Sequence, residues 1–328
     1  MLRQIVFSRK RTMSFLTGII LLALLLSACG QAQPSAQPKG SDTNQAPADT
    51  AAERTVTDAM GHKVTIPANP QRVLAPYLED HLLTLGVTPV AQWSVQNGKK
   101  QDYLEKYLKD VPLMPYDMPP EQVLDAQPDL IIISSESMVQ KGLYEQYSAI
   151  APTYVLGDKV SSDWRQSLLT IGELLNKQAD AEKAVADYEA KAAAAKKELQ
   201  GVAGDQSVAI LWLTKKNFYI VDPKKSSGAV VYGDLGLKAP ALMVEADSDA
   251  SWTSITLEKL PELNADHIFL INSDKGAGSE TLERPIWKAL PAVQKGHVYT
   301  MDSKGSWLYS GKIANEAMID DVLKAMVK

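Results

Sequence analysis

The chain has few of the residues on which disulfide, metal and nucleophilic chemistry depend. Its 328 residues include one cysteine and four histidines. A single thiol excludes an internal disulfide framework and a cysteine metal cluster. No Gly-x-Ser-x-Gly sequence or phosphate-binding glycine loop occurs, and Thr281 stands where the Gly276-Ala277-Gly278 segment would need a third glycine to bind a dinucleotide. We therefore expect no catalytic residues, no resident metal and no cofactor. His81 follows the first expected strand, where α/β sheets place their ligands, so metal binding stays open as an alternative.

A long hydrophobic run is also missing, although a short one lies near the N-terminus. Four basic residues precede it, and it spans residues 19–26 and ends in Leu26-Ser27-Ala28-Cys29. This pattern is typical of a secretory signal peptide over residues 1–28 and is too short for a membrane span. The small residues before Cys29 resemble the lipobox of bacterial lipoproteins, in which the cysteine is acylated and becomes the N-terminus. We expect lipidation at Cys29 and an extracytoplasmic protein anchored to the bacterial membrane by its lipid.

The segment after this cysteine is poor in residues that could form a core. Residues 30–52 contain no aromatic or large aliphatic side chain, so we predict a disordered, lipidated tether over 29–53. Removal of the signal peptide takes away four basic side chains and no acidic one, which moves the formal charge from −5 to −9. Such an acidic surface argues against binding to nucleic acid and to anionic lipid.

The longest uninterrupted run of helix-forming residues is Ala179–Gln200, which predicts one long helix. Its apolar residues thin out to Val185, Tyr188 and Leu199, a narrow stripe that favours a bridging position. On both sides of it, short aliphatic strands alternate with amphipathic helices, as in α/β folds. We predict an N-terminal α/β lobe over 54–161, linker helices over 162–201 and a C-terminal α/β lobe over 202–328. An ordinary surface helix of one large domain is the alternative.

The two halves share an ungapped correspondence of nine residues. Glu121 to Asp129 and Glu258 to Asp266 each begin with a glutamate at an expected helix start and end with an aspartate before an aliphatic strand. Repeated architecture at a long interval implies two similarly built lobes. Chance similarity between amphipathic helix–strand units is the alternative.

Phenylalanine is scarce, with four residues, whereas the chain has six tryptophans and twelve tyrosines. Tryptophan and tyrosine combine a flat apolar face with a polar edge, which suits a small-molecule site that is half in contact with water. Six of them lie at expected strand ends or in the loops that follow: Trp93, Trp212, Tyr219, Trp252, Trp307 and Tyr309. We predict that they line a cleft between the lobes; packing at a lobe edge is the alternative for each.

The lipobox, the paired Glu segments and the long helix together resemble the lipoproteins of ABC importers in the iron-siderophore and cobalamin group, which have a periplasmic-binding-protein-like fold. The resemblance covers the chain from about Thr55 to its end. It implies two Rossmann-like lobes joined by one rigid helix, and a monomeric binding protein instead of an enzyme. It also implies that Glu121 and Glu258 dock on an ABC permease dimer that works with an ATPase. Stabilisation of a helix N-terminus is the alternative role for these carboxylates.

Within this group the chain is most similar to proteins that bind ferric hydroxamate siderophores. There, a Trp before the second Glu segment and a Trp-x-Tyr near the C-terminus wall the pocket, and Trp252 and Trp307-Leu308-Tyr309 match them. The resemblance implies a ferric siderophore of hydroxamate or citrate-hydroxamate type, with haem, cobalamin or a metal ion as alternatives. Residues 114–118 lack the arginine that such proteins can use, and arginine is sparse throughout the expected folded part, so a neutral or singly anionic chelate fits better than a tris-catecholate. The candidate cations are Arg165, Lys215 and Lys216.

Overall fold

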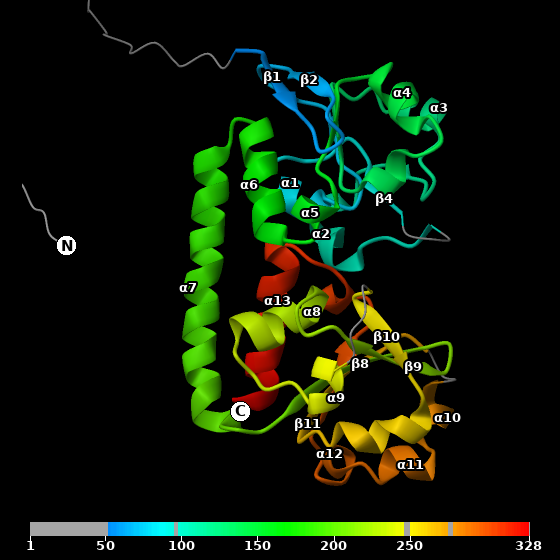
Figure 1. Ribbon diagram of the computed structural model, residues 1–328, viewed down its shortest axis with the longest axis vertical. Coiled ribbons are helices and arrows are strands. Elements are labelled where there is room, and N and C mark those ends of the chain that lie inside the picture. Colours follow the sequence, from blue (N-terminus) through cyan, green and yellow to red (C-terminus); the bar gives the residue numbers. More distant parts are fainter. Residues whose placement is uncertain (1–51, 95–97, 246–249, 275–277, 328) are drawn as a thin grey trace, which may run out of the picture. The chain divides into compact units, whose positions relative to one another are not determined.

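The computed structural model describes residues 52–94, 98–245, 250–274 and 278–327 (Figure 1). These residues belong to one structural unit that starts at Asp49. The predicted signal peptide, Cys29 and nearly all of the tether lie outside the described residues. Within the described ranges, none of the helices combines the length and the apolar character that a membrane crossing requires.

The N-terminal lobe is built on short parallel strands. A hairpin of β1 (Arg54–Thr57) and β2 (Lys63–Ile66) leads into a parallel sheet with the order β3-β6-β7 and a separate parallel pair, β4-β5. These strands are β3 (Val73–Leu74), β4 (Gln92–Trp93), β5 (Leu113–Met114), β6 (Leu130–Ile133) and β7 (Thr153–Val155). The helices are α1 (Glu79–Thr84), η2 (Asp102–Leu104), α2 (Glu105–Leu108), α3 (Pro120–Asp125), η3 (Glu136–Val139), α4 (Leu143–Ser148), α5 (Asp158–Ser161) and α6 (Trp164–Leu174).

The C-terminal lobe has a single larger sheet with the order β10-β9-β8-β11-β12. Strands β8 (Val208–Thr214), β11 (His267–Asn272) and β12 (Val298–Asp302) are parallel, and β9 (Asn217–Val221) and β10 (Trp252–Ile255) are antiparallel additions at one edge. The helices are α8 (Ser226–Gly228), the π-helix η4 (Ala229–Asp234), α9 (Ala241–Glu245), η5 (Leu257–Leu263), α10 (Gly278–Leu282), α11 (Pro285–Lys288), α12 (Pro291–Gln294), η6 (Ser306–Leu308) and α13 (Lys312–Met326). The predicted pair of α/β lobes joined by one long helix is therefore the observed fold.

The joining helix, α7 (Gln178–Ala203), is longer than predicted and is packed along its length against α6 and α13 (Figure 1). Its buried stripe consists mainly of alanines: Ala181, Ala184, Tyr188, Ala192, Ala195, Leu199 and Ala203. They recur every three or four residues and thus share one face. The stripe belongs to an apolar cluster that extends into both lobes. Because the core is continuous through α6 and α7, the lobe boundaries stay a proposal.

The repeated segment has the same structural role in both lobes. Asp129, just before β6, accepts hydrogen bonds from the backbone N–H groups of Gln71 (2.7 Å) and Arg72 (2.9 Å), beside the start of β3. Asp266, just before β11, accepts from the backbone N–H (2.9 Å) and the hydroxyl (3.1 Å) of Ser207, beside the start of β8. Each aspartate thus fixes the start of a parallel strand pair.

Candidate ligand-binding site

A cavity of about 380 Å³ lies between residues of the two lobes. It opens near the carboxyl ends of β3 and β6, the edge at which α/β sheets bind ligands. Six of its lining residues are serines. The N-terminal lobe and its adjoining helices contribute Tyr77, Leu78, His81, Gln101, Ser134, Ser161, Ser162 and Trp164, and the C-terminal lobe contributes Lys225, Ser226, Ser251, Trp252, Leu308, Tyr309 and Ser310.

A larger hollow, of about 550 Å³, lies among α1, α7 and α13, but its chemistry does not favour a ligand. Its lysines already have acidic partners: Lys183 pairs with Asp187 at 2.6 Å, and Lys312 pairs with Glu316 at 2.6 Å. It also lies away from the strand ends. We therefore assign the ligand to the smaller cavity, which combines aromatic faces with hydroxyl groups.

Aromatic side chains from both lobes meet at the chosen cavity. The ring of Tyr77 lies 5.0 Å from that of Trp93 and 6.2 Å from that of Tyr309, measured between centroids. The ring of Tyr103 lies 5.0 Å from that of Tyr309. Burial raises the pKa of Tyr309 to about 12, so its hydroxyl is protonated at neutral pH and can donate a hydrogen bond.

Sequence reasoning missed Tyr77, which lies near the middle of this group of rings. Its backbone has a φ of 64°, a left-handed conformation that is rare for a bulky residue, and its side chain is 42% exposed. Backbone strain of this kind is found at binding sites, where the surrounding structure holds a side chain in a required place. No sequence pattern predicts that a tyrosine adopts a left-handed backbone conformation. The only available signal was its position shortly after the first strand.

Two titratable residues beside Tyr77 have strongly shifted pKa values. Burial raises the pKa of Glu79 to about 7, although the backbone N–H of Trp93 (2.7 Å) and Nε2 of Gln101 (2.6 Å) donate hydrogen bonds to it. Burial lowers the pKa of His81 to about 4, so its ring is neutral at pH 7. Neither ring nitrogen of His81 makes a well-formed hydrogen bond to a described residue. Both ring nitrogens are buried, so His81 lines the cavity as a neutral ring.

Of the residues predicted to bind the ligand, Trp252 and Tyr309 line the cavity. The other three do not line it: Trp93 and Trp212 lie one ring behind the lining and Tyr219 lies two rings behind it. Trp93 packs on Tyr77, and Trp212 packs on Trp252 with a centroid distance of 5.8 Å. Tyr219 follows at 5.5 Å from Trp212. We retain these three as residues that support the rings lining the cavity.

The structure places Trp307 elsewhere than predicted. Its side chain is 1% exposed and stacks on Phe269 with a centroid distance of 5.0 Å. Its Nε1 donates a hydrogen bond to Asp321 on α13 at 2.9 Å. A buried ring with a satisfied N–H has no surface left for a ligand, so Trp307 is a core residue and the predicted ligand contact is not retained.

Arg165 also does not line the cavity. Its guanidinium forms ion pairs with Asp234 (2.9 Å) and Glu189 (3.4 Å), and it lies over the rings of Trp164 and Tyr188. These contacts join α6 and α7 to η4 of the C-terminal lobe. Lys215 and Lys216 lie in the β8–β9 turn and do not line the cavity either. Among the described lining residues, Lys225 is the one with a cationic side chain at neutral pH, and it lies 3.7 Å from the carboxylate of Asp222.

The two glutamates of the repeated segment are exposed. Glu121 is in the first turn of α3, which begins at Pro120, and Glu258 is in the first turn of η5, which begins at Leu257. The two positions match within their lobes. Across the described ranges, no three histidine, aspartate or glutamate residues gather as a metal site would require.

The sequence signature described as "Periplasmic binding protein" matches residues 77–304 of the chain. The chain is 31% identical over 316 residues to the iron(3+)-hydroxamate-binding protein FhuD of Bacillus subtilis (strain 168), a match that covers 94% of this chain and 96% of that protein. It is 28% identical over 336 residues to the probable siderophore-binding lipoprotein YfiY of the same organism, covering 95% of this chain and 97% of that protein.

The fold is likewise similar to solved structures. One is a FhuD fold-family protein from Bacillus subtilis, described as the periplasmic binding component of a Fep/Fec-like ferrichrome ABC transporter. It superposes with a TM-score of 0.71 at 28% sequence identity, and the match covers 83% of this chain and all of that chain.

Proposed function

Because this chain belongs to the family of periplasmic binding proteins, we propose that it binds an iron(III)-siderophore between its two lobes and delivers it to an ABC permease. The siderophore is of the hydroxamate or citrate-hydroxamate type. Relatives of nearly the same length carry names that state iron(III)-hydroxamate or siderophore binding. The family is one of substrate-binding proteins and not a class of enzymes.

The cavity at the strand ends is the observation that carries this function. Its aromatic faces, from Tyr77, Trp252 and Tyr309, match the apolar backbone of an organic chelator. Its serine hydroxyls, together with the side chain of Gln101, can hydrogen-bond to the chelator's amide and carbonyl groups. The iron is cargo that stays in the oxygen shell of the chelator, so the protein needs no metal ligands of its own.

The charge of the cavity supports a hydroxamate over a trianionic tris-catecholate. The described lining contains no arginine, Lys225 lies beside Asp222, and the carboxyl group of Glu79 is buried next to Tyr77. A buried negative charge without several compensating cations is costly. A ferric hydroxamate, which has little net charge, avoids this cost.

Delivery is assigned to the two exposed glutamates. Glu121 and Glu258 occupy equivalent positions in the two lobes, and a carboxylate in an exposed first helical turn is available to basic residues of a partner. We assign them to docking on a permease dimer that an ATPase drives. The lipid on Cys29 anchors the receptor to the membrane outside the cytoplasm. The receptor acts as a monomer.

A fluorescence titration tests the ligand class. Trp164 and Trp252 line the cavity, so a ferric hydroxamate should quench intrinsic tryptophan fluorescence in a saturable way. The iron-free chelator at the same concentrations is the control for absorption by the ligand. Haem, cobalamin and ferric ion alone complete the panel. Saturable binding of haem or cobalamin, together with no response to ferric hydroxamates, would overturn the proposed function.

A further inference from the structure

Helix α13 begins without a side-chain cap of its own. Its N-cap residue is Gly311, with a φ of 147°, and no side chain at that position accepts a hydrogen bond from the helix. The first backbone N–H groups of a helix need an acceptor, because they have no partner within the helix. A side chain could not be accommodated at position 311, since a Cβ there would lie 2.3 Å from Cγ of Asp80.

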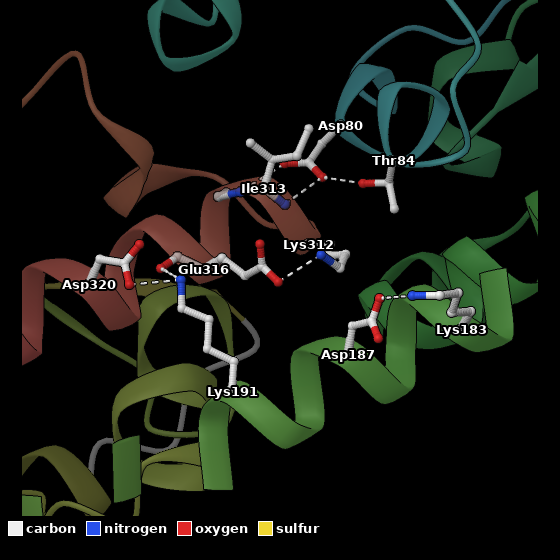
Figure 2. A network of polar contacts seen from close by, with 10 residues as sticks. Asp80, Thr84, Lys183, Asp187, Lys191, Lys312, Ile313, Glu316 and Asp320 are labelled. Atoms are coloured by element: carbon white, nitrogen blue, oxygen red, sulfur yellow. Dashed lines mark hydrogen bonds and ion pairs between the residues drawn. The ribbon is translucent and has the colours of Figure 1, made fainter. Parts of the chain in front are cut away.

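Asp80 of the N-terminal lobe supplies the missing cap (Figure 2). Its Oδ1 accepts a hydrogen bond from the backbone N–H of Ile313 at 3.0 Å, and its Oδ2 accepts from that of Ala314 at 2.9 Å. These are the second and third residues of α13, the N–H groups that an N-cap side chain normally binds. The hydroxyl of Tyr103 donates to Oδ2 at 3.1 Å. We call these contacts of Asp80 with Ile313 and Ala314 the interlobe cap.

The interlobe cap joins the two segments that face each other across the cavity. Asp80 lies three residues after Tyr77 and next to His81, which both line the cavity. On the other lobe, Gly311 directly follows the lining segment 308–310, which contains Tyr309. The carboxylate of Asp80 therefore connects the segments that form the two opposite walls of the cavity. The ring centroids of Tyr77 and Tyr309, one on each wall, are 6.2 Å apart.

Hydrogen bonds, and not ion pairs with the nearby lysines, hold the carboxylate of Asp80 in place. In Figure 2, Lys312 pairs with Glu316 at 2.6 Å and Lys191 of α7 pairs with Asp320 at 2.7 Å. In the described part of the chain, these nearby cations therefore have partners other than Asp80. Asp80 is 2% exposed, and its carboxylate accepts hydrogen bonds from the two backbone N–H groups and from the hydroxyls of Tyr103 and Thr84. Separation of the lobes at this point would break a charge-assisted contact and uncover the start of α13.

We propose that Asp80 is a positioning residue that sets the width of the siderophore cavity by capping a helix of the opposite lobe. The inference rests on the proposed function for its ligand readout. Tyr103 strengthens the contact, because its ring also packs on Tyr309 at 5.0 Å and its neighbour Asp102 pairs with Lys304 of the C-terminal lobe at 3.4 Å.

The test compares Asp80→Asn with Asp129→Asn in the full chain. Both aspartates accept two backbone N–H groups, but those bound to Asp129 belong to its own lobe. An asparagine side chain has one acceptor oxygen and turns an N–H₂ group toward the second N–H. We expect Asp80→Asn to weaken the binding of ferrioxamine B, a ferric hydroxamate, by about tenfold or more. Asp129→Asn should lower the melting temperature without changing this affinity.

A second readout does not depend on the ligand. Spin labels attached at Glu145→Cys and Gln294→Cys, with Cys29 replaced by Ala, report the separation of the lobes. The distance distribution should broaden in Asp80→Asn and stay unchanged in Asp129→Asn. If Asp80→Asn fails to fold, Tyr103→Phe removes one donor and keeps both N–H contacts; it should change affinity and distances in the same direction by a smaller amount.

The outcomes separate the two proposals. If the wild-type protein does not bind the chelate but the distances broaden in Asp80→Asn, the interlobe cap stands and the proposed function fails. If the wild-type protein binds the chelate while Asp80→Asn and Tyr103→Phe both keep the wild-type affinity and the wild-type distances, the positioning role of Asp80 is refuted.

Discussion

The two lobes are alike where they build their sheets and different where they meet the ligand. In both, an aspartate before a buried strand, Asp129 or Asp266, fixes the start of the neighbouring parallel strand. Both lobes line the cavity with aromatic rings and serine hydroxyls, but the N-terminal lobe alone adds three consecutive buried titratable residues, 79–81, of which His81 lines the cavity and the other two lie behind it. The repeated part of the sequence therefore maintains the scaffold and carries the two glutamates that we propose for docking, and the unrepeated part lines the proposed binding site.

The largest effect should come from the repeated glutamates. Replacement of both Glu121 and Glu258 by Ala should abolish uptake of the ferric siderophore, because each lobe loses its docking carboxylate, and either single variant should reduce uptake. Affinity for the ligand should not change, since neither residue lines the cavity. Uptake by cells and the dissociation constant of the purified protein are measured in parallel. Glu145→Ala, an exposed glutamate on α4, is the control, and normal uptake by the double variant would refute equivalent docking by the two lobes.

Replacement of two tryptophans of the C-terminal lobe should affect different properties, stability for Trp307 and ligand affinity for Trp252. Trp307→Ala removes a buried ring and should lower the free energy of unfolding by about 3–5 kcal/mol. Trp252→Ala removes a ring from the cavity wall and should weaken ligand binding, with a smaller loss of stability. Urea unfolding and fluorescence titration of both variants measure the contrast. Equal losses of affinity in two variants that remain folded would return Trp307 to the binding site.

Glu79, one of the buried acids in the N-terminal lobe, should make stability depend on pH. The pKa of Glu79 is about 7 in the folded protein and lies above its ordinary value of 4.5, so the folded state binds the proton more tightly. The free energy of unfolding that this group contributes is therefore greatest below pH 4.5, falls as the pH rises to about 7, and is constant above that. The difference in stability between the wild-type protein and Glu79→Gln, measured by urea unfolding from pH 4.5 to 8, should fall over this range. A difference that does not vary with pH would contradict the assignment.

The smallest effects should come from the scaffold. Asp129→Asn should lower the free energy of unfolding by about 1 kcal/mol, because its two oxygens bind two backbone N–H groups and one of these loses its acceptor. Asp266→Asn should lower it less, because a single oxygen of Asp266 accepts both bonds from Ser207. Thermal unfolding of the two single variants measures this. A larger loss in Asp266→Asn than in Asp129→Asn would contradict this account of how the two aspartates hold the strand starts.

Much of the fold could be predicted from runs of helix-forming residues and from repeated segments, which are visible in the sequence. The run 179–200 predicted the long helix, and the repeated Glu-to-Asp segment predicted the matching lobes. The alanine stripe of α7 was missed because alanine is common on exposed helical faces too, so its burial depends on the neighbouring helices α6 and α13. Local preferences set the elements, and tertiary packing decides which faces are buried.

The site was predictable only in part. Trp252 and Tyr309 line the cavity as the sequence predicted, but the same reasoning misplaced Trp307, which turns into the core although it lies only two residues before Tyr309. Arg165 could not be assigned from sequence, since its partners Asp234 and Glu189 are distant along the chain. Tyr77 and Asp80 depend on a backbone angle and on a contact between lobes, and neither leaves a pattern in the sequence.

The central claim is that a ferric hydroxamate occupies the cavity between Tyr77, Trp252 and Tyr309. A crystal structure of the protein with ferrioxamine B, with anomalous data collected at the iron edge, tests it most directly. We expect one iron peak inside this cavity, surrounded by chelator oxygens, with the three rings packed on the organic backbone. An iron peak bound directly by protein side chains, or a chelate bound elsewhere while this cavity remains empty, would contradict the account.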